Sequence, residues 1–450
     1  MVNTLFLPEL REMLAEDNRS GLREFCEALN PGRTAEYMEG LTPTEAWGVL
    51  RQTDKVRRAE IFSFFDPLRQ VEILRAEPAA ELASLLVELA ADDRVDLLQE
   101  LDESRVAEIL PLLPTADRRD IMRLIAFPQG TAGALMTSEV AKLSERLTIR
   151  EALEALSKQA ENLETIYYLY VVDDDNVLRG VVSGRQLISS LAKPERRVSD
   201  LMETDVVTVN VNEHQEQVAE KVERYDLLAI PVVDGGRHLL GIITHDDVID
   251  VVREELIEDA QRIAGINPLD ESYLHINLLS LAGKRGPWLT ILFFAALLTT
   301  FALKRFEEDL RLYEWLVLFI PLIISSGGNS GSQAATLVIT ALNSGELRLT
   351  DWLAVMLREL WMGLLLGSGL AALGFIFALF LAPSWTAASV LPITLIGVVV
   401  VGCLSGSILP LLFKRAGLDP ALMSTPFVTG IIDILGIVIY FTVARLIFMG

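Results

Sequence analysis

A single aspartate stands near the middle of the last long apolar stretch of this chain. Asp433 lies 13 residues after Pro420 and 17 before the end of the sequence. An ionisable side chain at the bilayer centre costs about 2.5–3.5 kcal/mol, so a cation, water or a partner must offset it. A structural aspartate that caps a neighbouring helix or pairs with Arg445 is the alternative, although an intrahelical pair with Arg445 is out of reach. The position favours a role for Asp433 in a cation pathway.

Further acids crowd a predicted helix that runs from Asp247 to Ile263. Its apolar stripe is Val248, Val252, Leu256 and Ile263. Like charges at i, i+4 destabilise a helix by about 0.2–0.5 kcal/mol per pair, and a divalent cation would relieve that repulsion. Because this helix joins the polar and apolar halves of the chain, it also suggests a gating role. The acids at its other positions are Asp247, Asp250, Glu254, Glu255, Glu258 and Asp259.

Other acids and the cysteines have plainer interpretations. Asp92 and Asp96 stand at i, i+4, which predicts two carboxylates on one exposed helix face, but a solvated helix start in a favourable dipole explains them equally well. Glu359 lies a turn or two inside an apolar stretch, where a structural hydrogen bond explains it as well as conduction does. Cys26 and Cys403 lie in different halves and form neither a disulfide framework nor a zinc site.

The average composition hides two different halves. The 450 residues are 51% hydrophobic and 22% charged, with a net charge of −23. Residues 287–450 hold 8 Lys+Arg and 9 Asp+Glu, so nearly all of that charge belongs to the first 286 residues. An acidic surface disfavours nucleic acid; it attracts metal cations or simply keeps the unit soluble. No signal peptide is apparent, so we expect the long N-terminal part to stay in the cytoplasm.

The apolar half predicts five membrane-spanning helices, since about 20 residues cross a bilayer. Basic residues near their ends place the N-terminus inside and the C-terminus outside by the positive-inside rule. The second span carries a run of Gly and small polar residues, Ser325–Gln333, which lets helix backbones approach closely. The approximate spans are 284–304, 313–341, 354–382, 390–413 and 421–448.

An ungapped internal repeat with an offset of 61 residues occupies the end of the acidic half. Leu178–Ser183 matches Leu239–Thr244, and Val171-Val172-Asp173 recurs in the same register. Each copy predicts a strand, an Asp-rich turn, a second strand and a helix, with Ser183 and Thr244 as N-caps. The pattern resembles a tandem pair of CBS domains over about 132–250, modules that bind adenine nucleotides or act as regulatory and dimerising units.

A nucleotide site in such pairs places an acid in a Ser/Thr-x-x-Asp turn to contact the ribose. The second copy has Asp247 there, whereas the first copy has Gln186. The resemblance implies ATP or another adenine nucleotide as a candidate ligand. The residues that could contact it are Tyr168, Tyr170 and Arg185.

The sequence of residues 1–127 predicts short helices separated by prolines. Pro31, Pro43, Pro67 and Pro78 stand at or near the predicted helix starts. We predict an α-superhelix of small helix pairs. The predicted domains are an N-terminal helical domain at 1–127, a CBS pair (α+β) at 128–249, an acidic connecting helix at 250–270 and a five-span pore domain at 271–450.

This order of domains resembles the MgtE family of magnesium channels and transporters over essentially the whole chain. The resemblance rests on Gly130–Thr137, on Gly327–Gln333, and on Pro426 with Asp433 seven residues later. It implies a homodimer with its pore on the two-fold axis, where Asp433 of each subunit binds Mg²⁺. Where the family often has Asn before this proline, the chain has Thr425, whose hydroxyl can still contact a metal-bound water. The other residues expected to line or shape the pore are Pro426, Gly328, Asn329, Gly331, Gln333 and Glu359.

The same resemblance implies that cytosolic Mg²⁺ bridges acids of the soluble domains and the connecting helix and thereby closes the channel. The chemistry of the residues agrees, because Mg²⁺ keeps several waters and needs only one or two carboxylates. By motif position the regulatory acids are Asp92, Asp96, Asp226, Asp247, Asp250, Glu255, Glu258 and Asp259.

The sequence therefore predicts a dimeric, multidomain Mg²⁺ channel of the bacterial inner membrane that takes up Mg²⁺ and is gated by it. Two charges moving through 100 mV gain about 4.6 kcal/mol. No P-loop motif is present, which argues against an ATPase. A channel of this kind is expected not to be an enzyme. The rivals are a proton- or sodium-coupled exporter of divalent cations that uses Asp433, and a non-transporting membrane sensor of Mg²⁺ or nucleotide.

Overall fold

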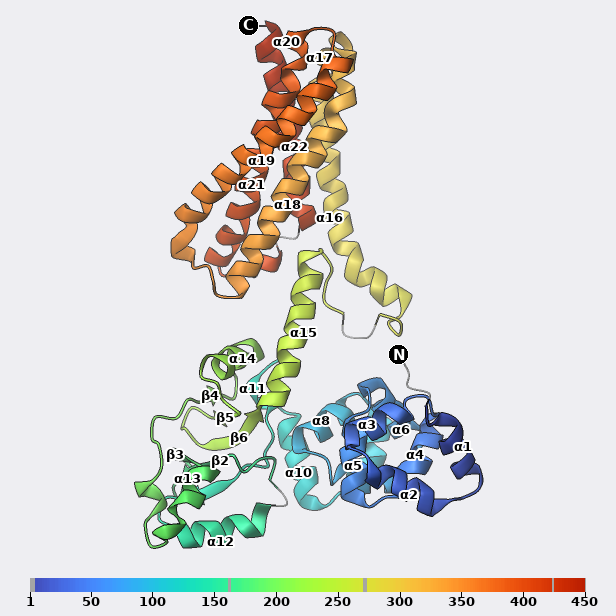
Figure 1. The fold of residues 1–450 in the computed structure, drawn as a ribbon, viewed down its shortest axis with the longest axis vertical. Coiled ribbons are helices and arrows are strands. Elements are labelled where there is room, and N and C mark those ends of the chain that lie inside the picture. Colours follow the sequence, from blue (N-terminus) through green and yellow to red (C-terminus); the bar gives the residue numbers. More distant parts are fainter. Residues whose placement is uncertain (1–4, 161–162, 270–272, 423–424, 450) are drawn as a thin grey trace. The chain divides into compact units, whose positions relative to one another are not determined.

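The computed structural model describes residues 5–160, 163–269, 273–422 and 425–449. The chain divides into two compact units, residues 1–252 and 253–450 (Figure 1). The boundary falls inside helix α15 (His245–Ile263), so this predicted acidic helix begins in the first unit and ends in the second. Each unit is described by itself below.

The first unit opens with a lobe of short helices, as predicted. Asn30, Thr42 and Asp66 are N-caps whose side chains accept backbone N–H groups, each followed by proline at the first helical position. Each helix from α3 to α7 packs against the helix two places further along the chain, which produces the predicted superhelix. The helices are α1 (Leu7–Ala15), α2 (Arg19–Ala28), α3 (Pro31–Met38), α4 (Pro43–Leu50), α5 (Lys55–Ser63), α6 (Pro67–Ala76), α7 (Ala79–Leu86), α8 (Ala91–Gln99), α9 (Glu103–Ile109) and α10 (Thr115–Leu124).

The internal repeat folds into two three-stranded sheets of identical topology. In each, a short first strand pairs parallel with the second, which pairs antiparallel with the third. The predicted offset of 61 residues holds for the bounds of the strand pairs and for an irregularity at Val171/Val172 and Val232/Val233. The elements are α11 (Ala132–Leu135), β1 (Lys142–Ser144), α12 (Ile149–Gln159), β2 (Tyr168–Val172), β3 (Leu178–Ser183), α13 (Gly184–Ser189), β4 (Val209–Asn210), α14 (Gln215–Arg224), β5 (Ala229–Val233) and β6 (Leu239–Thr244).

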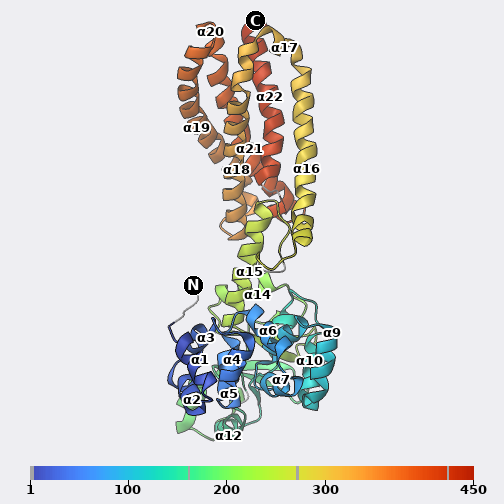
Figure 2. The same ribbon diagram turned by 90° about the vertical axis from the view of Figure 1, so that its right-hand side faces the viewer.

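The second unit is a bundle of long helices that run alongside one another (Figure 2). Helix α18 packs against both α21 and α22, around buried side chains that include Phe319, Val398, Ile432 and Phe441. Helix α16 contacts α22 and buries none of its own residues. The helices are α16 (Leu278–Arg305), α17 (Glu307–Leu312), α18 (Ile320–Asn343), α19 (Trp352–Leu381), α20 (Trp385–Ala388), α21 (Val390–Arg415) and α22 (Thr425–Met449).

Among the described residues, four helical segments are long and apolar enough to cross a membrane. They are 278–305, 349–381, 385–415 and 425–448, and they correspond to four of the five predicted spans. The remaining predicted span becomes α18, a continuous helix of 24 residues through the whole polar run Ser325–Gln333. Residues 423 and 424 of the last predicted span lie outside the described part of the chain.

Glycines bring the backbones of α18 and α21 into direct contact. A Cβ at Gly402 would lie 2.6 Å from the carbonyl oxygen of Gly327, and one at Gly406 would overlap the carbonyl oxygen of Gly331. Neither oxygen belongs to a side chain, so neither can rotate away. Gly402 and Gly406 of α21 are therefore needed for the close packing of this helix against the polar run of α18.

We expect Gly406→Ala to destabilise the second unit by about 1–3 kcal/mol, because the added methyl group forces α18 and α21 apart. Thermal unfolding of the full-length protein in detergent would measure the loss. Gly369→Ala is the matched control, since nothing lies within 4 Å of a Cβ at that position of α19. Equal melting temperatures for the two variants would contradict this account.

Candidate functional site

Asp433 is the ninth of the 25 residues of α22 and faces α18. Its Oδ1 atom is buried and has no hydrogen-bond partner in the described part of the chain. A Cβ at Gly328 would lie 3.6 Å from this oxygen and 2.8 Å from Cγ2 of Thr429. Gly328 thus leaves open the space in front of the carboxylate, which a larger residue would fill.

The structural alternative for Asp433, an ion pair with Arg445, is not formed. The Arg445 guanidinium instead donates to Oδ2 of Asp309 at 2.8 and 3.0 Å and lies over the ring of Phe306. Asp309 is only 4% exposed, so this pair satisfies a buried acid at another place in the bundle. Among the described residues, no basic side chain pairs with the carboxylate of Asp433.

A row of hydroxyl groups leads along α22 from its first residue to Asp433. Thr425, Thr429 and Asp433 follow one another at i, i+4 and i+8, which places them on one helix face. The hydroxyls of Ser332 and Thr429 lie 2.8 Å apart, and both contact the carbonyl oxygen of Thr425. Ser332 and Thr429 were not predicted from the sequence, although the spacing of four from Asp433 could have indicated Thr429.

The other predicted pore residues occupy different surroundings. Pro426 is the second residue of α22, and Gly331 lies against Ile432 and the backbone of Gly402. The exposed Asn329 donates to the hydroxyl of Ser325 at 3.3 Å, and Gln333 is exposed on the same helix. Glu359 is half-buried on α19, whose main packing partner is α21.

In the first unit, acids of the helical lobe and of the repeat converge. Asp92, at the start of α8, is only 9% exposed, and its Oδ1 has no partner among the described residues. The prediction of an exposed pair is therefore wrong for Asp92, because α8 turns this side toward the repeat, whereas Asp96 is exposed. Burial and then the charge of Asp247 hold the pKa of Asp92 well above its usual range.

Two acids of the repeat share this electrostatic environment. Burial raises the pKa of Asp247 to about 6, although Thr244 opposes the shift by donating from its hydroxyl at 2.6 Å. Glu164 is partly open to solvent, but desolvation by the surrounding protein, together with the charge of Asp247, raises its pKa to about 7. Asp93 and Asp246 add further negative charge. We call Asp92, Asp93, Glu164, Asp246 and Asp247 the interface acids.

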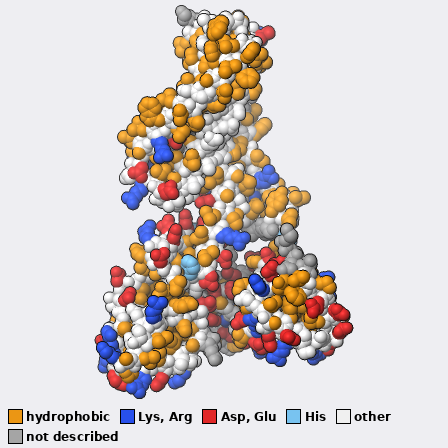
Figure 3. Space-filling view, in the orientation of Figure 1, with side chains coloured by type: hydrophobic (Ala, Val, Ile, Leu, Met, Phe, Trp, Pro, Cys, Tyr) orange, Lys and Arg blue, Asp and Glu red, His pale blue; other side chains and the backbone are white. Residues whose placement is uncertain are grey.

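The interface acids repel one another and do not form a ready-made chelate. Within the described ranges, no three His, Cys, Asp or Glu side chains lie close enough to hold an ion together. In the space-filling view, acidic side chains gather on the facing sides of the helical lobe and the repeat (Figure 3). Such an arrangement suits Mg²⁺, which dehydrates reluctantly and is often held through its waters.

Arg94 is a buried basic residue beside these acids. Its guanidinium donates to Oε1 of Glu139 and to the carbonyl oxygen of Leu89, and it lies 3.4 Å from Asp117. Because Glu139 precedes β1, this pair joins the helical lobe to the repeat directly. The lobe is therefore attached to the repeat even where the neighbouring acids repel.

The raised pKa values predict that the metal-free first unit is less stable at neutral than at mildly acidic pH. Between about pH 4 and 7 the folded unit binds protons at Asp247 and Glu164 that the unfolded chain does not, so stability falls as pH rises through this window. We expect about 1–2 kcal/mol between pH 5.5 and 7.5 in EDTA, after allowance for solvent screening.

Thermal unfolding of the full-length protein would measure this difference, and Mg²⁺ at millimolar concentration should reduce it. Asp247→Asn should reduce it as well, because the amide does not ionise. An Asp247→Asn protein with the full pH dependence of the wild type would show that other groups cause it.

The remaining predicted regulatory acids divide between the two units. In the first unit, Asp226 has a left-handed backbone (φ +49°) just after α14, and Asp250 is exposed on α15. In the second unit, Glu258 pairs with Arg262 at 2.8 Å. Asp259 accepts a hydrogen bond of 2.8 Å from Asn343 at the end of α18, and burial raises its pKa. Glu255 lies on the same stretch of α15.

The candidate nucleotide contacts differ in accessibility. Tyr170 is 1% exposed and packs in a core with Val172 and Ile242, which leaves the half-exposed Tyr168 as the more accessible ring. Arg185 is exposed on α13. Gln186 forms a capping box with Ser183, so it keeps the role of an N3 acid in the helix start but lacks the charge.

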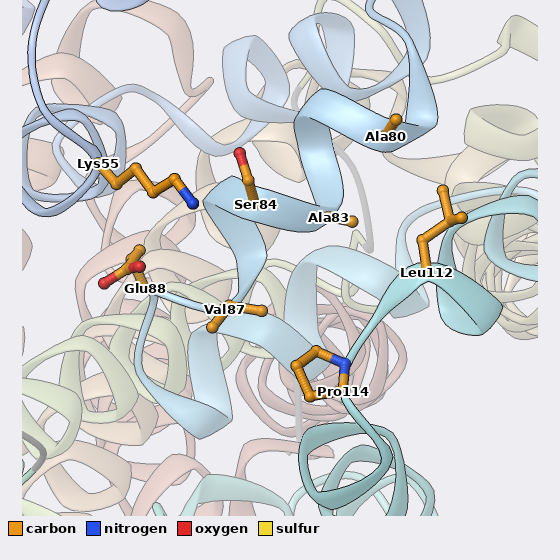
Figure 4. A pocket seen from close by; sticks show the side chains of 8 residues that line it. All are labelled: Lys55, Ala80, Ala83, Ser84, Val87, Glu88, Leu112 and Pro114. Carbon is orange, nitrogen blue, oxygen red and sulfur yellow. The ribbon is translucent and has the colours of Figure 1, made fainter.

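The helical lobe also contains a cavity of about 430 Å³, and none of the interface acids lines it (Figure 4). Lys55 and Glu88 stand at one side of it, and mostly apolar residues such as Ala80, Leu112 and Pro114 line the rest. It offers one carboxylate and one amine, which is not a donor set for Mg²⁺.

Comparison with known proteins assigns the class. A family model described as a divalent cation transporter matches residues 320–443, the region of α18 to α22. The model of the MgtE intracellular N domain matches residues 29–130, and that of the CBS domain matches 132–193 and 198–254. The fold and the site thus define a multi-pass membrane protein of the divalent cation transporter class, with a CBS pair in its soluble unit.

The relatives identify the family. The magnesium transporter MgtE of Thermus thermophilus is 36% identical over 444 residues, 97% of each chain. That of Bacillus subtilis is 33% identical over 353 residues, 78% of this chain and 77% of its own. A crystal structure of the cytosolic domain of the Mg²⁺ channel MgtE in complex with ATP is 37% identical with a TM-score of 0.51, and covers 54% of this chain and 98% of that one. The chain belongs to the MgtE family of magnesium transporters.

Proposed function

We propose that this protein conducts Mg²⁺ into the cell down its electrochemical gradient and that Asp433 is the ion-binding residue of the pore. The observation that carries the proposal is the buried Oδ1 of Asp433, which has no hydrogen-bond partner among the described residues and lies inside a helix long and apolar enough to span a membrane. An ionised carboxylate in that place requires a cation or water. The relatives are magnesium transporters, which selects the ion.

Mg²⁺ is here the transported substrate, and it fits the groups around Asp433. A hydrated ion needs acceptors for its waters as well as one or two direct ligands. The carboxylate and the hydroxyls of Thr425 and Thr429 supply acceptors on one face of α22. The polar row therefore suits an ion that keeps much of its hydration shell.

We further propose a homodimer, because a second copy would bring a second Asp433 to the same axis and provide two carboxylates for one divalent ion. In this arrangement the N-terminus is cytoplasmic and the C-terminus is outside, in accordance with the basic residues near the helix ends. The protein is a transporter rather than an enzyme in this proposal. Chemical cross-linking of the full-length protein in membranes would test the dimer.

Cytosolic Mg²⁺ closes the channel by binding between the helical lobe and the repeat and along α15. The mutual repulsion of the interface acids supports this step, because a divalent cation would remove it. The proposed regulatory residues are Asp92, Asp96, Asp226, Asp247, Asp250, Glu255, Glu258 and Asp259.

Flux through the purified, reconstituted protein tests the proposal against its rivals. Mg²⁺ entry that follows an imposed potassium diffusion potential, with no movement of protons or sodium, is the expected result. Proton or sodium movement in fixed ratio to Mg²⁺ would instead identify a coupled exporter. A protein that binds Mg²⁺ but passes none would be a sensor.

ATP is a further candidate ligand of the repeat. The related cytosolic domain was crystallised with ATP, and this chain keeps Asp247 and an accessible Tyr168. We expect ATP to bind the full-length protein, with Tyr168→Ala weakening binding about tenfold, because stacking of a base on an aromatic ring contributes about 1–3 kcal/mol. Calorimetry would measure this, and unchanged affinity in the variant would place the base elsewhere.

A further inference from the structure

The last turn of α15 carries a cation that bridges two carboxylates. The Arg262 guanidinium donates from one terminal nitrogen to Oε2 of Glu258 and from the other to Oδ2 of Asp419, both at 2.8 Å. Glu258 lies one turn back on the same helix, whereas Asp419 is 157 residues away in the sequence. A planar guanidinium with two donating edges is well suited to such a bridge, and lysine would reproduce it less well.

Asp419 connects this bridge to the helix that carries Asp433. Its other oxygen, Oδ1, accepts the backbone N–H of Ala421 at 2.8 Å, which fixes Asp419 to the short turn just before α22. A second contact joins the same two segments, because Thr425, the first residue of α22, donates from its hydroxyl to the carbonyl oxygen of Ile263 at 3.3 Å. The end of α15 is therefore attached at two points, to Asp419 before this turn and to Thr425 at the start of α22.

We propose that Arg262 is an internal cationic latch, which holds the end of α15 on the start of α22 when no divalent ion is bound and so restrains the pore helix. Without it, Glu258 and Asp419 would be two like charges on adjoining segments. The latch deepens the proposed function, since it rests on α15 being the element that gates the pore. Arg262 is a positioning residue, because it acts on Asp433 only through α22.

The bridge formed by Arg262 should be sensitive to salt concentration. The side chains of Arg262, Glu258 and Asp419 are 34%, 34% and 31% exposed, so the bridge is open to screening by salt. An exposed ion pair of this kind changes the equilibrium between the open and closed channel by about five-fold at most. Monovalent salt should therefore loosen α15 in the wild type and have little effect once the pair is gone.

The test is the open probability of single channels formed by the full-length protein, with EDTA on the side of the soluble unit and Mg²⁺ as charge carrier on the other side. We expect Arg262→Gln to raise open probability about three- to five-fold and to abolish its rise with potassium chloride concentration. Arg262→Lys should restore part of the restraint. Arg253→Gln, which removes an equal charge from the same helix, is the matched control and should behave like the wild type.

A double-mutant cycle assigns the effect to the bridge. Asp419→Asn keeps the acceptor for the N–H of Ala421 but loses the charge, so Arg262→Gln should add nothing to it. Equal effects of Arg262→Gln in both backgrounds, or an open probability that falls in the variant, would overturn the latch. Hydrogen exchange of the backbone amides of residues 258–263 provides an independent readout, and we expect faster exchange in Arg262→Gln. This result would support the bridge even if the wild-type protein conducted no Mg²⁺. In that case the proposed function would fail, but the bridge would not.

Discussion

Replacing Asp433 by asparagine should reduce Mg²⁺ flux by at least about 100-fold. The amide keeps the size and one acceptor oxygen of the carboxylate but removes its charge. The attraction between that charge and the divalent ion offsets the free energy needed to remove water from the ion, so this stabilisation is lost in the variant. A loss of about 3 kcal/mol in the binding of the ion corresponds to a factor on the order of 100. Uptake of Mg²⁺ into proteoliposomes under an inside-negative potential is the measurement.

The control for this prediction neutralises an acid in a loop of the same unit. Glu346→Gln should leave flux unchanged, since Glu346 is exposed between α18 and α19. Melting temperatures in detergent must show that Asp433→Asn is folded; because removing a buried, unpaired charge stabilises a protein, it should melt no lower than the wild type. A folded Asp433→Asn protein with normal flux would place the ion-binding step on other residues and favour the sensor as the function.

The joint replacement of Asp92 and Asp247 by asparagine should abolish most of the closure by Mg²⁺. These two acids come from the helical lobe and the repeat. Burial raises the pKa of both, and the charge of Asp247 raises the pKa of Asp92 further. Without their charges, Mg²⁺ has little to bridge there and the repulsion it relieves is already absent. We expect the Mg²⁺ concentration for half-closure to rise at least about tenfold, which corresponds to 1.4 kcal/mol.

Patch-clamp recording with Mg²⁺ titrated on the side of the soluble unit measures this midpoint. Asp174→Asn with Asp175→Asn is the matched control, because it removes two exposed acids from a turn of the repeat. The conductance of the open channel should be the same in both double variants. Closure at the wild-type Mg²⁺ concentration would show that the interface acids do not sense the ion.

The periodic features of the fold were predictable from the sequence. The 61-residue offset gave the two copies of the strand–turn–strand motif and their bounds, since strand pairing follows local alternation and turn residues. Prolines after Asn30, Thr42 and Asp66 marked helix starts because their effects are local. The sequence missed the short strands β1 and β4, which have three and two residues and form only by pairing with a longer strand.

The candidate sites were predictable to different degrees. Asp433 was found because an acid in an apolar helix is conspicuous in any fold. Asp93 and Asp246 could have been added as neighbours of Asp92 and Asp247, but Glu164 could not, because it reaches the interface acids only through the fold of the repeat. The burial of Asp92 was likewise unpredictable, since an acid two residues into a helix usually faces water.

The sequence by itself determined which segments are apolar, which are acidic, where the repeat lies and which family the chain resembles, because these depend on residue types and short-range spacing. Tertiary structure alone decided that Arg445 pairs with Asp309, that Oδ1 of Asp433 has no hydrogen-bond partner in the described part of the chain, and that Arg262 reaches Asp419. These pairings join residues more than one hundred positions apart, and the cost or gain of a charge depends on what surrounds it. The spacing of residues along one helix determines only which contacts can form within that helix. Which residue of another helix pairs with a charged side chain depends on how the helices pack.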